Sequence, residues 1–154
     1  MDDELGAVLD RSFARASAAT ARAYPPERRL TRAQLDRYLD RRAYAVVSSA
    51  RADGRPHAAP SLFYRRGAEF WLPAVAGSAR ERNVRAHPWL ALTVTEGDDD
   101  AHVAVLVEGP AAVLPPEEAP AEFRARPGDW AQVWLLVRAE KVLSYAEPGV
   151  ALED

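Results

Sequence analysis

Residues 52–88, ADGRPHAAPSLFYRRGAEFWLPAVAGSARERNVRAHP, decide the fold of this chain. Asp53-Gly54 predicts a tight turn, because glycine supplies the positive φ that a hairpin needs. The alternating stretch from His57 to Tyr64 predicts a strand after the turn, and Glu69 to Leu72 predicts a third strand that pairs back on it. A helix over Ser78 to Ala86 completes the segment, since a proline follows it closely.

The strand from His57 to Tyr64 has features that suit a flat ligand. Pro60 cannot donate a hydrogen bond to a neighbouring strand, so we expect this strand at a sheet edge or bulged at that residue. The small residues Ala58, Ala59 and Ser61 would let a planar ring approach the backbone closely. They would also suit a thin layer of the core, and periodicity does not choose between the two interpretations.

The start of the helix over Ser78 to Ala86 is a candidate anion site. A helix N-terminus exposes unpaired backbone N–H groups and a partial positive charge. Ser78 adds a hydroxyl donor, and the planar guanidinium of Arg80 matches phosphate oxygens. The alternative is structural: Ser78 and Glu81 form a capping box on their own, and the Glu81 carboxylate would compete with an anion.

The remaining pattern predicts a mainly β protein with peripheral helices. About six strands, mainly linked as hairpins, with one helix inserted midway indicate a small antiparallel split β-barrel. A further helix is expected over Pro115 to Arg126. The predicted strands are Tyr44–Ser49, His57–Tyr64, Glu69–Leu72, Trp89–Thr95, His102–Leu114 with an interruption near Gly109-Pro110, and Trp130–Tyr145.

Helical patterns precede the first strand. An amphipathic helix is expected before Tyr24-Pro25-Pro26, because two prolines do not continue it, and a second begins at Thr31, which forms a plausible capping box with the glutamine three residues later. We therefore expect three parts: an N-terminal helical arm over 1–29, a barrel over 30–146 and a tail over 147–154.

The composition excludes several classes of function. A net charge of −3 over 154 residues argues against a dedicated nucleic-acid binder, which is usually basic. His57, His87 and His102 lack metal-ligand spacing, and the chain has no cysteine, so no metal site is expected. With no visible signal peptide and no apolar run of membrane length, we expect a cytoplasmic protein with no membrane partner.

The order of these motifs resembles that of the flavin-binding split barrels of the pyridoxamine 5′-phosphate oxidase-like family. That family shares a DGxP-x-x-x-P motif after the first strand, then S/R-x-K/R-x-x-N before an R-x-x-P segment. The resemblance covers residues 30–145. The matching residues are Asp53-Gly54-Arg55-Pro56, Pro60, Ser78, Arg80, Asn83 and Arg85-Ala86-His87-Pro88, with VLVEGPA over Val105–Ala111 as the later match.

The resemblance implies a site for flavin mononucleotide (FMN) and assigns roles to its residues. Ser78 and Arg80 would hold the cofactor phosphate, with Asn83 supporting that turn. Three residues would lie along the ring or ribityl side, partly through their backbone: His57, Pro60 and Ser61. Three others would flank the isoalloxazine: Leu72, Pro73 and Ala74.

The resemblance also implies an activity and an assembly. It points to a homodimer with the cofactor at the subunit interface, and to an oxidoreductase that transfers hydride through the flavin N5 to or from a small molecule. Arg80 stands where the family commonly has lysine. The chain ends in PGVALED without the substrate-binding arginines of the authentic oxidases, so vitamin B6 oxidation is not expected.

Three alternatives stay open. The family divides between users of FMN, which we favour, and users of 8-hydroxy-5-deazaflavin, whose anionic tail prefers a basic groove. The barrel could instead be a non-enzymatic module for storage, sensing or interaction, or its pocket could be filled by side chains. No side chain stands out as a catalytic acid or base. The arginines that could build a basic groove, or an ordinary solvated surface, are Arg51, Arg55, Arg65, Arg66, Arg82 and Arg85.

Overall fold

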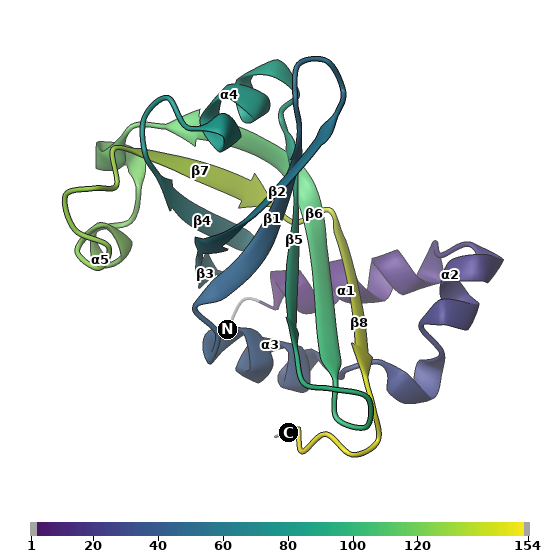
Figure 1. Cartoon of the computed structure of the whole chain (residues 1–154). Coiled ribbons are helices and arrows are strands. Elements are labelled where there is room, and N and C mark those ends of the chain that lie inside the picture. The colour runs from purple at the N-terminus through teal and green to yellow at the C-terminus, as the bar shows by residue number, and fades with distance from the viewer. Residues whose placement is uncertain (1–2, 153–154) are drawn as a thin grey trace.

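The computed structural model describes residues 3–152, which form an antiparallel sheet curled into a half-barrel with peripheral helices (Figure 1). The predicted fold class is confirmed. The strands follow the order β2-β1-β5-β6-β7-β4-β3, and β8 pairs with β6. Over the described residues the sheet has eight strands rather than six. They are β1 (Tyr44–Ala50), β2 (Pro56–Leu62), β3 (Tyr64–Arg66), β4 (Glu69–Ala74), β5 (Trp89–Glu96), β6 (Val103–Leu114), β7 (Val133–Arg138) and β8 (Lys141–Ala146).

Both additional strands come from extended segments that change partner midway. Residues 56–66 pair with β1 as far as Leu62 and with β4 from Tyr64, so one predicted strand becomes β2 and β3. Residues 133–146 run along β6 throughout, but one extra residue on their side separates β7 from β8. Such a β-bulge bends a strand, which helps the sheet to curl.

Gly109 makes this bulge possible. A Cβ atom at this position would lie 1.9 Å from the carbonyl oxygen of Arg138, so only glycine lets the two strands cross this closely. The expected interruption of β6 near Gly109-Pro110 is wrong, because β6 runs unbroken from Val103 to Leu114. Gly109-Pro110 instead marks the point where β6 exchanges β8 for β7 as its partner.

Two predicted helices are divided into shorter ones, whereas the helix predicted after Ser78 is found as Ala79–Ala86. The first predicted helix is divided at Ser17, whose Oγ accepts the N–H of Thr20 and caps a new helix. The helix predicted over residues 115–126 is reduced to a 3₁₀ turn and one short helix, separated near Pro120. None of the described helices is long and apolar enough to cross a membrane. The helices are α1 (Glu4–Ala14), α2 (Ala18–Ala23), α3 (Arg32–Asp40), α4 (Ala79–Ala86) and α5 (Ala121–Arg124), with 3₁₀ turns at Pro26–Arg28 and Pro116–Glu118.

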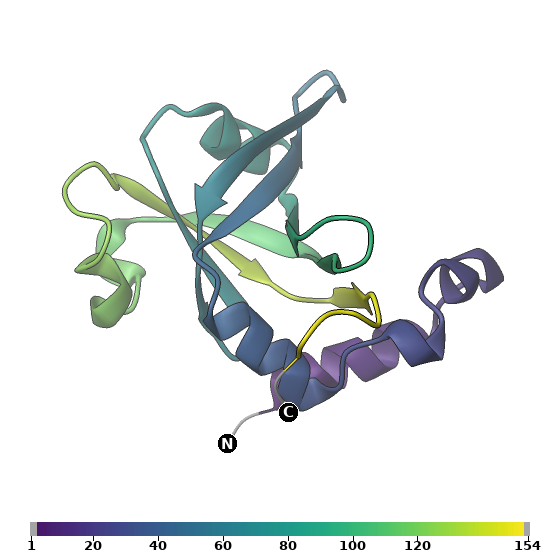
Figure 2. The same ribbon diagram turned by 60° about the horizontal axis from the view of Figure 1, so that its bottom comes forward.

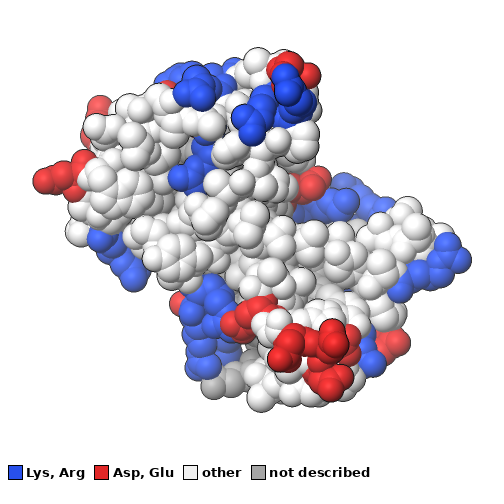
Figure 3. Space-filling view, viewed as in Figure 1, with Lys and Arg blue, Asp and Glu red and all other residues white. Residues whose placement is uncertain are grey.

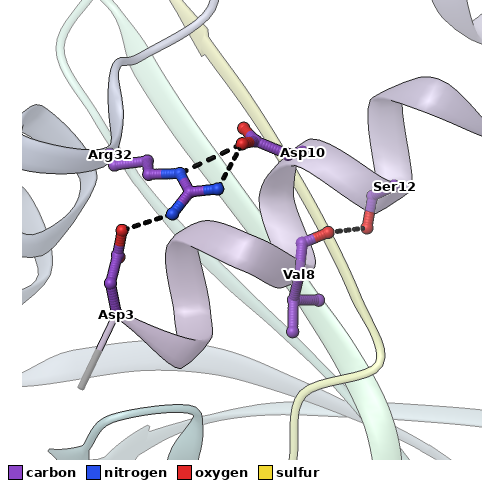
Figure 4. A network of polar contacts seen from close by, with 5 residues as sticks. All are labelled: Asp3, Val8, Asp10, Ser12 and Arg32. Atoms are coloured by element: carbon purple, nitrogen blue, oxygen red, sulfur yellow. Dashed lines mark hydrogen bonds and ion pairs between the residues drawn. The ribbon is translucent and has the colours of Figure 1, made fainter.

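The N-terminal helix α1 packs against the sheet and contributes Leu5 and Val8 to the main core. α1 and α3 lie together below the barrel (Figure 2). The Arg32 guanidinium of α3 donates to Asp3, just before α1, at 2.6 Å and to Asp10 of α1 at 3.0 Å, and so links the two helices (Figure 4). The division of the chain at residue 29 stays a prediction, and the outermost residues of the expected arm and tail (1–2 and 153–154) lie outside the described part.

Candidate functional site

The sheet is open between β2 and β4, at the edge that Pro60 predicted. β2 is the first strand in the sheet order, so its outer side has no partner strand among the described residues. β3 pairs with β4 only over Glu69 to Trp71, which leaves Leu72 to Ala74 paired on the β7 side alone. β2 and β4 approach each other without pairing. The outer backbone N–H and C=O groups of β2 can therefore face a ligand, whereas Leu72 and Ala74 of β4 are fully buried.

The chain leaves β4 at the opening and enters α4 through a short loop. Ser78 caps the helix, because its Oγ accepts the backbone N–H of Glu81 at 3.4 Å. The Glu81 carboxylate accepts the N–H of Gly77 at 3.3 Å rather than that of Ser78, so the expected capping box is displaced by one residue. The Ser78 hydroxyl donates to no described residue. Its hydrogen remains available to an anion at the helix start.

Arg80 lies on the face of α4 that packs against the sheet. It precedes the buried residues Asn83 and Val84 by three and four positions, which is the spacing of one helix face. Its Nη1 atom is buried and has no hydrogen-bond partner among the described residues. Burial lowers the pKa of the Arg80 guanidinium. Because a buried cationic N–H group without a partner is unfavourable, this side chain fits an oxyanion ligand.

Asn83 anchors α4 on the barrel rather than on the preceding turn. Its Nδ2 donates to Ser49 Oγ at 3.0 Å, and both side chains are buried. Ser49 lies opposite His57 in the β1–β2 register, so His57 lies at the same end of the barrel as α4. The Nδ1 atom of His57 is also buried without a described partner. Two unpaired polar atoms, on Arg80 and His57, therefore lie at this end.

The other candidate residues lie along the two strands that border the opening. Pro60 is exposed on β2, whereas Ser61 is buried and its Oγ donates to the next carbonyl oxygen at 2.9 Å. Leu72 and Ala74 are completely buried in the core, and Pro73 between them is also buried. This burial includes their backbone, so residues 72–74 form the floor of the opening rather than an accessible edge. All nine candidate residues lie on β2, at the end of β4, or on α4 and its N-cap.

Two residues that support the opening were not predicted from the sequence. Ser49 receives the anchoring bond from α4, as described above. Gln132 holds the loop between β4 and α4 with two hydrogen bonds. Its side-chain Oε1 accepts the backbone N–H of Ala76 at 3.0 Å, and its backbone N–H donates to the Ala74 carbonyl oxygen at 3.0 Å. Both are distant in sequence from α4, so no local pattern points to them.

The six candidate arginines do not form one groove. Arg65 and Arg66 lie on β3 and are occupied by carboxylates: Arg65 contacts Asp36 at 3.1 Å and Asp40 at 2.7 Å, and Arg66 pairs with Glu122. Figure 3 shows basic side chains gathered at the top of the molecule, over α4 and the β1–β2 hairpin. The arginines of that end are Arg51, Arg55, Arg82 and Arg85.

The outer face of β1 and β5 exposes large apolar side chains beside the opening. Tyr44 is 66% exposed, and Val46 and Trp89 are each 42% exposed. The strand register places Val46 between Pro60 of β2 and Thr93 of β5, so these residues share one face. In Figure 3 the middle of the molecule is mainly uncharged, between the basic top and an acidic patch at the β5–β6 turn.

This architecture defines a class: an antiparallel split barrel whose edge opening ends at a helix N-terminus with an unpaired arginine. The family model described as pyridoxamine 5′-phosphate oxidase matches residues 31–146. The chain therefore belongs to the pyridoxamine 5′-phosphate oxidase-like family, as the sequence motifs predicted. No curated protein matches the sequence.

Solved structures with the same fold include a FAD-binding protein and a heme storage protein. A conserved hypothetical protein from Mycobacterium tuberculosis has a TM-score of 0.67 and 18% identity, covering 80% of this chain and 89% of its own. A FAD-binding protein from Mesorhizobium loti has a TM-score of 0.63 and 20% identity, covering 77% and 95%. The heme storage protein HutZ from Vibrio cholerae has a TM-score of 0.58 and 12% identity, covering 74% and 93%. At these identities the likeness establishes the fold alone.

Proposed function

We propose that this protein binds FMN in the opening between β2 and β4, with the phosphate at the start of α4. The observation that carries the proposal is Arg80, whose buried Nη1 has no partner among the described residues. Ser78 would add its hydroxyl, and the first backbone N–H groups of the helix would add two more donors. Family membership and the FAD-binding relative support a flavin as the ligand class.

The proposed binding mode places the ring along β2 and over the end of β4. The β2 backbone around Pro60 would supply donors and acceptors to the ring, because β2 has no outer partner strand among the described residues, and the buried end of β4 over residues 72–74 would lie beneath the ring. His57, with its unpaired Nδ1, would face the ring or the ribityl chain from β2. The Asn83–Ser49 bond would hold the helix start at a fixed distance from both strands.

We also propose that the protein works as a homodimer. The exposed face that carries Tyr44, Val46 and Trp89 borders the opening, and contiguous apolar surface of this kind marks association sites. A second copy on this face would cover the ring and exclude water from it. The cytoplasmic location expected from the sequence remains a prediction.

The proposed activity is that of a flavin-dependent oxidoreductase acting on a small molecule. A bound flavin supplies hydride transfer at its N5 atom, so the protein's residues need only bind and orient. Arg80 and Ser78 would fix the phosphate end, and β2 and the end of β4 would fix the ring. Apart from His57, the nine candidate residues include no evident catalytic acid or base. This agrees with a protein that binds and orients a flavin whose ring carries the chemistry.

Titration of the purified protein with FMN, followed by flavin fluorescence, tests the proposal. Saturable binding is expected, and Arg80→Gln should raise the Kd about 10- to 150-fold, because a charged hydrogen bond contributes about 1.5–3 kcal/mol. Arg85→Gln is the matched control, since Arg85 is an exposed residue of the same helix whose guanidinium pairs with Glu81 at 3.5 Å. Equal affinity of the Arg80 variant and the wild type would reject the phosphate assignment.

The same titration separates the alternatives. Tighter binding of 8-hydroxy-5-deazaflavin than of FMN would favour the deazaflavin branch. The candidate arginines do not support that branch, because Arg65 and Arg66 are paired with carboxylates and so do not join the others in one basic groove. Saturable binding of heme with a Soret band lost in His57→Ala would favour a function like that of the heme storage relative. Stoichiometric flavin binding with no reduction by any nicotinamide donor would favour a storage or sensing module.

A further inference from the structure

A second concave site is lined by residues from the end of α3, from β3, and from α5 and the residues that follow it. These elements lie below α4 in Figure 1. The cavity has a volume of about 240 Å³, which suits a single ring with one small substituent rather than a cofactor. None of its lining residues belongs to α4 or to the nine candidate residues of the flavin opening. Its aromatic lining is Phe63, Tyr64 and Phe123, and its basic lining is Arg42, Arg65 and Arg126.

We call this cavity the β3 pocket, and the arginines of its back wall are held by contacts within the protein. The Arg65 side chain is only 9% exposed, and it is held by Asp36, Asp40 and the carbonyl oxygen of Gly67 at 2.9 Å. Arg42 is paired with a glutamate outside the pocket. The charges of both arginines are therefore compensated within the protein. Their Nε atoms are nevertheless buried without a hydrogen-bond partner among the described residues.

The front wall carries the uncompensated charge. The Arg126 guanidinium carbon lies 5.0 Å from the centre of the Tyr64 ring, and Arg126 forms no ion pair with a described carboxylate. Tyr64 in turn stacks on Phe123, with ring centres 5.4 Å apart and planes at 19°. Burial raises the pKa of the Tyr64 phenol, so its hydroxyl stays protonated and can donate a hydrogen bond. The pocket thus joins two stacked aromatic rings to a phenol donor and to a guanidinium that has no ion pair among the described residues.

From this arrangement we infer that the β3 pocket binds a small aromatic carboxylate, independently of the flavin. The ring of the ligand would pack against the edges of the stacked Tyr64 and Phe123 rings, whose faces contact each other and the guanidinium groups of Arg126 and Arg66. Its carboxylate would accept from the Arg126 guanidinium and the Tyr64 hydroxyl. Arginine matches a carboxylate in a bidentate geometry, which a neutral amide of the same shape does not reproduce. The pocket should therefore prefer benzoate to benzamide.

The test is a titration of the full-length protein with benzoate, followed by amide NMR shifts. Saturable shifts are expected around β3 and α5, and benzamide should bind at least about tenfold more weakly, the loss expected for one charged hydrogen bond. Arg126→Gln should remove this preference. Tyr64→Phe keeps the aromatic stack and should weaken benzoate several-fold. Arg124→Gln is the control, because Arg124 is an exposed residue of α5 that does not line the pocket.

The inference is overturned if benzoate causes no saturable shifts, if benzamide binds equally well, or if Arg124→Gln weakens binding as much as Arg126→Gln. Repeating the titration with protein saturated with FMN separates this site from the proposed cofactor site. Unchanged benzoate affinity is expected there. Competition between benzoate and FMN would mean that the β3 pocket belongs to the cofactor site, and would also overturn the inference. Failure of FMN binding would leave the benzoate result unaffected.

Discussion

Replacing Arg80 by methionine should stabilise the ligand-free protein and weaken its binding of FMN. The Arg80 guanidinium is partly buried, its Nη1 has no described partner, and burial lowers its pKa. Methionine keeps an unbranched apolar side chain that fills much of the same space, and it removes both the charge and the unpaired donor. The substitution therefore tests whether Arg80 serves ligand binding or the stability of the fold.

The size of the effect follows from the unpaired donor. A buried donor without a partner destabilises a protein by about 1–3 kcal/mol. For 154 residues, an unfolding entropy of about 2.1 cal/mol/K per residue gives about 0.3 kcal/mol/K, so Arg80→Met should raise the Tm by about 3–9 °C. FMN at 100 times its Kd should stabilise the wild type by about 2.7 kcal/mol, or about 8 °C, and the variant by less than about half of that.

Differential scanning calorimetry of both proteins, with and without FMN, measures all four Tm values. Arg85→Met is the matched control, because Arg85 is exposed on the same helix, and it should change neither the Tm nor the FMN response appreciably. The reasoning is refuted if Arg80→Met lowers the Tm of the ligand-free protein while FMN stabilises it as much as the wild type. Arg80 would then be a structural residue that the flavin does not touch.

Three further substitutions test the fold and the assembly. Gly109→Ala should destabilise the protein by about 3 kcal/mol or more, since its Cβ would meet the Arg138 carbonyl oxygen at 1.9 Å, and thermal unfolding that matches the wild type would contradict this. Asn83→Ala should reduce the free energy of unfolding, measured by urea denaturation, by about 1–3 kcal/mol, because it leaves the buried Ser49 hydroxyl without its partner. A double-mutant cycle with Ser49→Ala should give a coupling energy near that value, and a coupling of zero would contradict the assignment. Val46→Asp should convert a dimer into monomers in sedimentation velocity without loss of circular dichroism; a dimer that persists would place the interface elsewhere.

The predictable part of this fold rests on local chemistry. Gly54 adopts a positive φ of 87° in the turn that Asp53-Gly54 predicted. Thr31 and Gln34 form the predicted capping box, and Ser78 caps α4 as expected. Pro60 lies on an edge strand, as its missing N–H requires. In each case the signal lies within a few residues of the feature it determines.

The less predictable part depends on contacts between distant segments. The partner exchange of β6 at Gly109 depends on Arg138, and no pattern around either residue alone reveals that their backbones meet. The Asn83–Ser49 bond joins residues 34 positions apart. The site residues on β2, β4 and α4 were named through family motifs, and the strand pairing then explains why they lie around one opening. Their contact with a cofactor remains a prediction.

A crystal structure of the protein grown with FMN would test the phosphate assignment most directly. We predict the phosphate within hydrogen-bond distance of the Arg80 guanidinium and the Ser78 hydroxyl, with the isoalloxazine between β2 and the end of β4. Flavin density at any other place, with Arg80 still unpaired beside an empty opening, would contradict the account.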